Sequence, residues 1–132
     1  YESGCLFITL PSGRRLAYPR PRIENDTRFN KPISTYEGIE QKLWKRLKTY
    51  GPKLVENIVQ AVSRDCLATA IVRLHEAGYN IVFHVHDEVI AEMPNESGSV
   101  KEMCEIMSQP ISWAPGLPLE ADGFECEYYR KD

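Results

Sequence analysis

The hydrophobic positions along the chain recur with two periods, which predict where strands and helices lie. The runs CLFITL (5–10) and RRLAY (14–18) flank a Pro-Ser-Gly turn, a pattern typical of a β-hairpin. The Pro-, Asn- and Asp-rich stretch 19–32 predicts a loop. Residues 33–39 predict a short strand, and the basic run 41–50 predicts a weak helix.

The strongest helical pattern runs from Pro52 to Ala77. Gly51 breaks the preceding chain, proline suits a first helical position, and Gly78 is a typical stop signal. Apolar residues recur at three- and four-residue spacing and predict the buried face of this helix. They are Val55, Ile58, Val59, Val62, Cys66, Ala70 and Leu74.

Polar residues spaced by four, three and four positions share the opposite face of the same helix. They are Lys53, Asn57, Gln60 and Arg64. Two bases and two amides in a row can contact the phosphates and groove edges of a nucleic acid. An ordinary solvated helix face shows the same pattern, so both interpretations stay open at this point.

The stretch NIVFHVHDEVIAEMP is almost entirely β-branched and aliphatic, yet a histidine and two adjacent carboxylates lie near its middle. We interpret Ile81–Val85 and Val89–Met93 as antiparallel strands, with His86, Asp87 and Glu88 at the bend. At the tip of a hairpin these charges escape the cost of burial. Their carboxylates either serve a hard divalent cation or merely solvate the turn.

The remainder of the chain predicts short elements. Ser99 is a suitable N-cap for a helix that ends before Pro110. A Pro-rich loop over 110–118 follows, and we expect a final strand pair near 119–129. The whole pattern predicts an α+β fold, in which one antiparallel sheet is backed by the 52–77 helix.

Composition and charge add to this picture. The 132 residues are 42% hydrophobic, which suits one domain with a modest core, and no apolar run of about 18 residues predicts a membrane span. Four scattered cysteines without a CxxC pair predict reduced thiols rather than a zinc site. Residues 1–64 carry a balance of +6 and residues 65–132 a balance of −9. A basic half suits a polyanion and an acidic half suits metal chemistry, although chance clustering gives the same totals.

An ordered set of segments resembles family A DNA polymerases of the bacteriophage and prophage type. The segments are LPSGRRLAYPRPRIE, GPKLVENIVQAV, GYNIVFHVHDEVIAEMP and WAPGLPLEADGFECEYYRK, and they cover nearly the whole chain. The resemblance implies that the chain, 1–132, is the C-terminal part of the polymerase palm. Residues 1–32 would then form a hairpin and loop, 33–78 a connector and a long DNA-facing helix, and 79–132 the motif C hairpin, a short helix and C-terminal strands.

The His-Asp-Glu sequence matches motif C of that family. By this resemblance, Asp87 is one of two aspartates that hold the two Mg²⁺ ions of nucleotidyl transfer. Glu88 matches a supporting carboxylate, and His86 a histidine near the primer terminus. Lys53 and Asn57 match residues that contact the minor groove of the primer–template duplex.

Two departures from the family pattern concern the rest of the long helix and the rest of the active site. Gln60 arrives one residue earlier than the family's glutamine, and Ala61 stands where a glycine is usual. The D-Y-S motif A, which supplies the other aspartate, and the nucleotide-binding fingers helix are not found in this sequence. We therefore expect the last part of a DNA-directed DNA polymerase, inactive alone and completed by an N-terminal part. The complete enzyme would bind primer–template DNA and a deoxynucleoside triphosphate in the cytoplasm of a bacterial or phage-infected host, away from membranes.

Two alternatives remain from the residues themselves. His84, His86, Asp87 and Glu88 superficially resemble the ligand cluster of a metal-dependent hydrolase. The chain could also be a non-catalytic module that binds nucleic acid or protein through its basic half, in which case the three residues at the bend have no chemical role.

Overall fold

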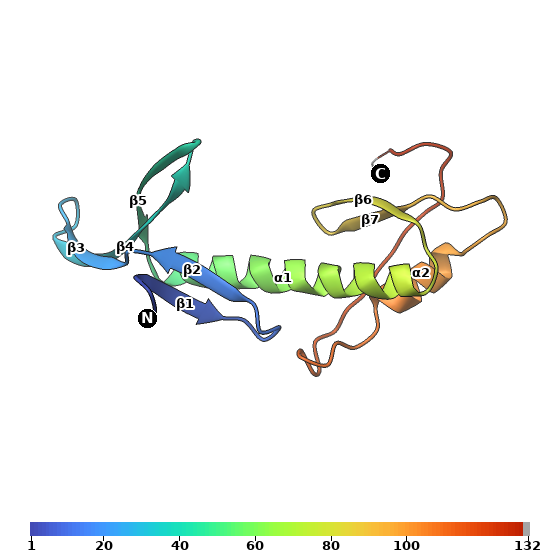
Figure 1. The fold of residues 1–132 in the computed structure, drawn as a ribbon, viewed down its shortest axis with the longest axis horizontal. Coiled ribbons are helices and arrows are strands. Elements are labelled where there is room, and N and C mark those ends of the chain that lie inside the picture. The colour runs from blue at the N-terminus through green and yellow to red at the C-terminus, as the bar shows by residue number, and fades with distance from the viewer. Residues whose placement is uncertain (131–132) are drawn as a thin grey trace. The chain divides into compact units, whose positions relative to one another are not determined.

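The computed structural model describes residues 1–130, which form an α+β fold of small antiparallel sheets and two helices, one of them long (Figure 1). The α+β prediction is confirmed. The prediction of one sheet is wrong, because the strands of the described residues form three separate sheets. Prolines help to separate the first two sheets, since Pro19 ends one strand and Pro21 precedes the next, and proline has no N–H for a ladder. The chain divides into two compact units, with the boundary after Val62.

The first sheet is the hairpin predicted at the start of the chain. Strand β1 (Cys5–Thr9) pairs antiparallel with β2 (Arg15–Pro19), and Leu6 lies opposite Tyr18. The ring of Tyr18 is buried and meets the ring of Tyr36 edge to face, with 5.0 Å between the centroids. This contact joins the hairpin to the second sheet within the first unit.

The second sheet corrects two sequence predictions. Its strands are β3 (Arg22–Asp26), β4 (Lys31–Glu40) and β5 (Leu43–Thr49), in that order. The predicted strand 33–39 lies within β4, but β3 occupies part of the predicted loop, and β5 replaces the predicted weak helix. Cross-strand pairing explains the second correction, because β4 and β5 place opposite charges face to face, as at Glu37 and Arg46.

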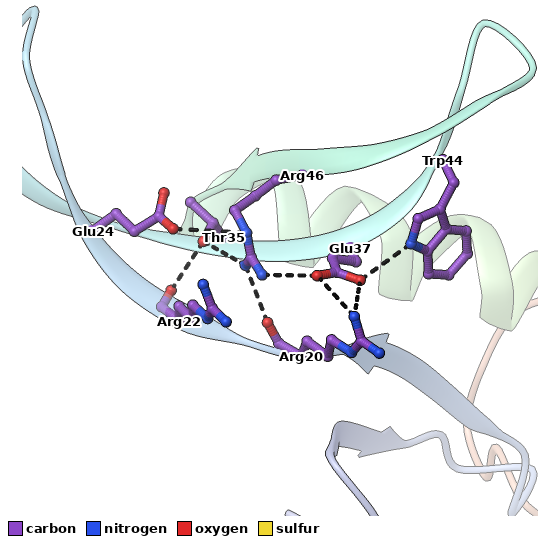
Figure 2. A network of polar contacts seen from close by, with 7 residues as sticks. All are labelled: Arg20, Arg22, Glu24, Thr35, Glu37, Trp44 and Arg46. Carbon is purple, nitrogen blue, oxygen red and sulfur yellow. Dashed lines mark hydrogen bonds and ion pairs between the residues drawn. The ribbon is translucent and has the colours of Figure 1, made fainter.

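A network of polar contacts centred on Glu37 covers one face of this sheet (Figure 2). The Glu37 carboxylate accepts hydrogen bonds from Arg46 (3.1 Å), Arg20 (3.2 Å) and the Trp44 indole N–H (3.1 Å). Arg46 also donates to the Thr35 hydroxyl and to the Arg20 carbonyl, both at 3.1 Å. The side chains of Glu37 and Arg46 are only 17% and 23% exposed. The Trp44 hydrogen bond, followed by the two arginines, lowers the pKa of Glu37 from its ordinary value of 4.5.

The long helix α1 (Gly51–Glu76) confirms the predicted helix to within one residue at each end. Its predicted apolar face is fully buried only toward the C-terminal end, at Ala70 and Leu74. Nearer the N-terminus, Val55 and Val59 remain 58% and 61% exposed. The described residues therefore leave Val55 and Val59 uncovered, whereas Ile58 and Val62 between and beyond them are half-buried. Among residues 1–130, no helix is long and apolar enough to cross a membrane.

The second unit contains the predicted apolar hairpin and the predicted short helix. Strand β6 (Ile81–Val85) pairs antiparallel with β7 (Glu88–Ala91). Helix α2 (Val100–Met107) begins after Ser99, whose side chain caps it by accepting a hydrogen bond from the backbone N–H of Glu102, as predicted.

A buried tyrosine connects the end of α1 to α2. The Tyr79 hydroxyl donates to the Glu102 carboxylate at 2.5 Å and accepts from the backbone N–H of Ser99 at 3.2 Å. The hydrogen bond to Glu102, together with burial, raises the pKa of Tyr79. This contact fixes where the chain emerges toward the β6–β7 hairpin.

The expected final strand pair over 119–129 is wrong, because the described residues there form no strand. Folding this stretch about Asp122–Gly123 would place Glu120 directly opposite Glu125. Like charges directly opposite one another destabilise a hairpin. The segment instead forms side-chain contacts, among them an edge-to-face contact of the Tyr129 ring with the Phe83 ring at 5.0 Å.

Candidate functional site

The tip of the β6–β7 hairpin holds two of the three residues predicted at the bend. Val85 is paired with Glu88, so His86 and Asp87 form a two-residue loop and Glu88 begins β7. His86 adopts a positive φ of 52°, in a backbone region that residues other than glycine seldom occupy. Six other non-glycine residues of 1–130 also have a positive φ, and a two-residue hairpin loop requires one, so the backbone alone does not single out this tip. The exposed carboxylates of Asp87 and Glu88 make it a candidate site.

The two carboxylates of the hairpin differ in their surroundings. Asp87 is exposed, and its carboxylate forms no hydrogen bond or ion pair with another residue of 1–130. Glu88 accepts a hydrogen bond of 3.4 Å from the Tyr129 hydroxyl, whose ring is itself placed by Phe83. The tail thus holds Glu88 weakly and leaves Asp87 available to a ligand.

A divalent cation fits this tip only in part. Mg²⁺ takes six oxygen ligands in near-octahedral geometry, and the carboxylate of Asp87, with Glu88 beside it, offers the hard oxygens that it prefers. Residues 1–130 bring together no group of three or more His, Cys, Asp or Glu side chains placed to hold a metal. The four-residue cluster of the hydrolase interpretation, which adds His84 and His86, is therefore not found in the described structure. Asp87 can supply one carboxylate to a cation whose other ligands come from elsewhere.

The predicted polar face of α1 is largely exposed. Lys53 and Gln60 lie in the first unit, and Arg64 lies just beyond the unit boundary on the same helix. Glu56 contacts two of these residues: it forms an ion pair with Lys53 (3.1 Å) and accepts a hydrogen bond from the Gln60 amide (3.3 Å). The Glu56 contact raises the pKa of Lys53, so this side chain stays charged. Exposed ion pairs of this kind contribute little to stability, so a phosphate can replace Glu56 as the partner of Lys53.

Asn57 differs from its neighbours on this face because the β1–β2 hairpin holds it. Its side chain is half-buried, and Nδ2 donates to the Tyr18 hydroxyl at 3.2 Å. One turn further on, the Arg14 guanidinium donates to the backbone carbonyl of the buried Ala61 at 3.0 Å. Asn57 therefore lies at the border between the packed and the exposed sides of the helix.

Sequence reasoning missed three residues that support these sites. Glu56 could have been found, because residues three and four positions apart on a helix are neighbours, and it lies at those distances from Lys53 and Gln60. Tyr18 and Tyr129 could not, since they lie 39 and 41 residues from their partners and meet them only through tertiary packing.

Comparison with known proteins identifies what the chain is similar to. No protein-family model matches it, and no solved structure matches it. A DNA polymerase of Bacillus phage SP02 is 58% identical over 133 aligned residues, which cover 100% of this chain and 20% of that polymerase. A DNA polymerase of Mycobacterium phage D29 is 34% identical over 109 residues, which cover 80% of this chain and 13% of that polymerase. The chain is thus homologous to a segment of phage DNA polymerases and spans about a fifth of the length of the SP02 protein.

Proposed function

We propose that this chain is the segment of a family A DNA polymerase that carries one metal-holding aspartate and a helix that contacts primer–template DNA. The observation that carries the proposal is the placement of Asp87 at an exposed, strained hairpin tip, in a chain homologous over its whole length to a phage DNA polymerase. The substrates of the complete enzyme would be primer–template DNA and a deoxynucleoside triphosphate.

In this proposal the β6–β7 hairpin is a rigid support for one carboxylate. Asp87 would hold Mg²⁺ together with ligands outside the described residues. A bound Mg²⁺ would stabilise the charge that develops on the phosphoryl oxygens. Short paired strands keep the position of such a carboxylate better than a flexible loop does. Glu88, tied to Tyr129, would orient rather than bind the cation.

The exposed face of α1 would contact the DNA. Lys53 and Arg64 are exposed cations suited to phosphates, and the amides of Asn57 and Gln60 are suited to groove edges. Residues 1–62 carry 11 Lys and Arg against 6 Asp and Glu, a balance of +5 that favours a polyanion. Binding and metal chemistry would then depend on different side chains, which variants can separate.

The test uses a chimera in which this chain replaces the matching segment of the SP02 polymerase, called here the SP02 chimera. Asp87→Asn preserves the shape of the side chain but removes the charge that balances Mg²⁺. The metal contributes several kcal/mol to the transition state, and each 1.36 kcal/mol is about tenfold in rate. We therefore expect turnover to fall on the order of a thousandfold or more, with DNA affinity and melting temperature nearly unchanged.

Glu88→Gln is the matched control, and it should lower turnover far less. The proposal is wrong if Asp87→Asn keeps more than about a tenth of the turnover, a loss below about 1.4 kcal/mol. A folded but inactive unmutated chimera would also overturn it. A non-catalytic binding module predicts a different pattern, in which DNA binding by the 132-residue chain persists while both substitutions leave chimera turnover unchanged.

A further inference from the structure

We propose that Tyr18 is a positioning residue, whose hydroxyl holds the Asn57 amide so that it can contact the minor groove at any base pair. This inference rests on the proposed function, because it takes the exposed face of α1 to be the DNA-contacting face. It concerns a residue on a different element from that face, which acts only through Asn57.

The Tyr18 hydroxyl is held rigidly. The residue is 5% exposed on β2, and its ring is fixed against the Tyr36 ring at an interplanar angle of 88°. A tyrosine has only two side-chain torsions, so burial of the ring leaves the hydroxyl little freedom. The 3.2 Å hydrogen bond from Asn57 Nδ2 therefore ends on an almost immobile acceptor.

A second contact sets the rotation of the helix relative to the hairpin. Arg14, just before β2, donates to the carbonyl of Ala61, four residues after Asn57 and on the same side of α1. The two contacts lie one helical turn apart. Together they determine how far Asn57 turns toward the exposed side of the helix.

The hydroxyl suits a contact that must tolerate every sequence. In the structure the Asn57 amide directs Nδ2 toward Tyr18, which leaves Oδ1 free to accept. Because a phenol hydroxyl both donates and accepts, the amide can turn over by 180° and keep a hydrogen bond to Tyr18. Every base pair presents acceptors in the minor groove, and a G·C pair adds the guanine amino donor. An amide that can present either end matches both kinds of pair.

Gln60 shows what a different partner would do. Its amide is held by the Glu56 carboxylate, which can only accept, so only the N–H end of Gln60 can face Glu56. The pairing with a hydroxyl is therefore specific to Asn57 among the two amides of this face.

The test is Tyr18→Phe in the SP02 chimera, which removes the hydroxyl and keeps the ring. Loss of one hydrogen bond of ordinary strength should lower the efficiency of extension from matched primers about two- to tenfold. The loss should be similar for A·T and G·C terminal pairs, with KM for the nucleotide unchanged. Tyr36→Phe is the matched control, because its hydroxyl forms no hydrogen bond with a residue of 1–130, and it should leave extension unchanged.

A double variant separates positioning from mere stability. Tyr18→Phe should add almost nothing in an Asn57→Ala background, and in the 132-residue chain it should shift the NMR signals of the Asn57 side-chain amide. Full additivity of the two losses, or an unshifted amide signal, would overturn the inference. A folded but inactive unmutated chimera would overturn the proposed function instead. An active chimera in which Tyr18→Phe is silent would remove only the role of Tyr18.

Discussion

Two carboxylates of this chain, Glu37 in β4 and Asp87 in the β6–β7 loop, show opposite uses of the same group. Glu37 is 17% exposed and accepts hydrogen bonds from two residues of β5, Trp44 and Arg46, and from Arg20 in the segment between β2 and β3. Asp87 is exposed, with no partner in the part of the chain that the structure describes. The paired carboxylate holds a sheet together, whereas the unpaired one, beside the strained His86, is available to a ligand.

The paired carboxylates of the β3–β4–β5 sheet make its stability depend on pH. Neighbouring donors lower the pKa of Glu37, chiefly Trp44, and that of Asp26, chiefly the backbone N–H of Arg28 followed by Lys48. A lowered folded-state pKa adds stability above the unfolded value, and this stability is lost as the pH falls through the folded value. The ordinary values are 4.5 and 3.8, so the β3–β4–β5 sheet should weaken below about pH 4.5.

The largest expected effect on stability comes from removing the guanidinium of Arg46, which binds Glu37. Arg46→Met keeps the apolar stem but leaves the buried Thr35 hydroxyl and the Arg20 carbonyl without their donor. The free energy of unfolding should fall by about 1 to 3 kcal/mol at neutral pH. Thermal or urea unfolding of the 132-residue chain measures this, with Asp87→Asn as the control that should stay within about 0.5 kcal/mol.

Measuring the unfolding of the parent and of Arg46→Met at lower pH tests whether Arg46 and Glu37 are coupled. The pKa of Glu37 is lowered in part by Arg46, so the variant should lose less additional stability than the parent as the pH falls. The difference between the two should therefore shrink below about pH 4.5. A difference that stayed constant from pH 7 to pH 3.5 would mean that the network does not couple to this carboxylate.

The positive φ of His86, beside Asp87, predicts a substitution that raises the stability instead of lowering it. His86→Gly should raise the free energy of unfolding by about 1 kcal/mol, because glycine adopts a positive φ without a steric cost. Turnover of the SP02 chimera should nevertheless fall, since the imidazole beside Asp87 is lost. Asn30→Gly is the matched control, since Asn30 also has a positive φ, 46°, but lies in the β3–β4 loop. It should stabilise without lowering turnover. Equal loss of turnover in both variants would make the strain at His86 functionally irrelevant.

The smallest effect concerns Lys53, an exposed cation that can exchange its partner. Lys53→Ala should reduce the salt dependence of duplex binding by the SP02 chimera by about one phosphate contact. Glu56→Gln removes the competing carboxylate and should instead strengthen binding at low salt. Binding isotherms over a series of salt concentrations measure both changes. If neither variant alters the slope, this face of α1 is ordinary solvated surface.

The sequence predicted the parts of the structure that depend on local patterns. The 52–77 helix, the first hairpin, the apolar hairpin around Asp87 and the cap at Ser99 all follow from periodicity and turn residues near in sequence. Strand β5 was missed because Leu43, Trp44 and Leu47 have a spacing compatible with a helix, and only pairing with β4 reveals the strand. The separation into three sheets and the supports at Tyr18 and Tyr129 depend on packing between distant segments, which a single sequence does not display.

The contact of Tyr129 with the β6–β7 hairpin has a consequence for protein synthesis. Tyr129 follows Glu88 by 41 residues, so a ribosome completes the hairpin well before it adds the ring that packs on Phe83. At roughly 5 to 20 residues per second, the delay is about 2 to 8 seconds. During that interval the nascent chain lacks the ring that packs on the hairpin. We expect released chains truncated before Tyr129 to be cleaved faster near Phe83 than chains that include Tyr129. Limited proteolysis of the two forms would detect this difference, and equal cleavage rates would show that the hairpin reaches its final form without the tail.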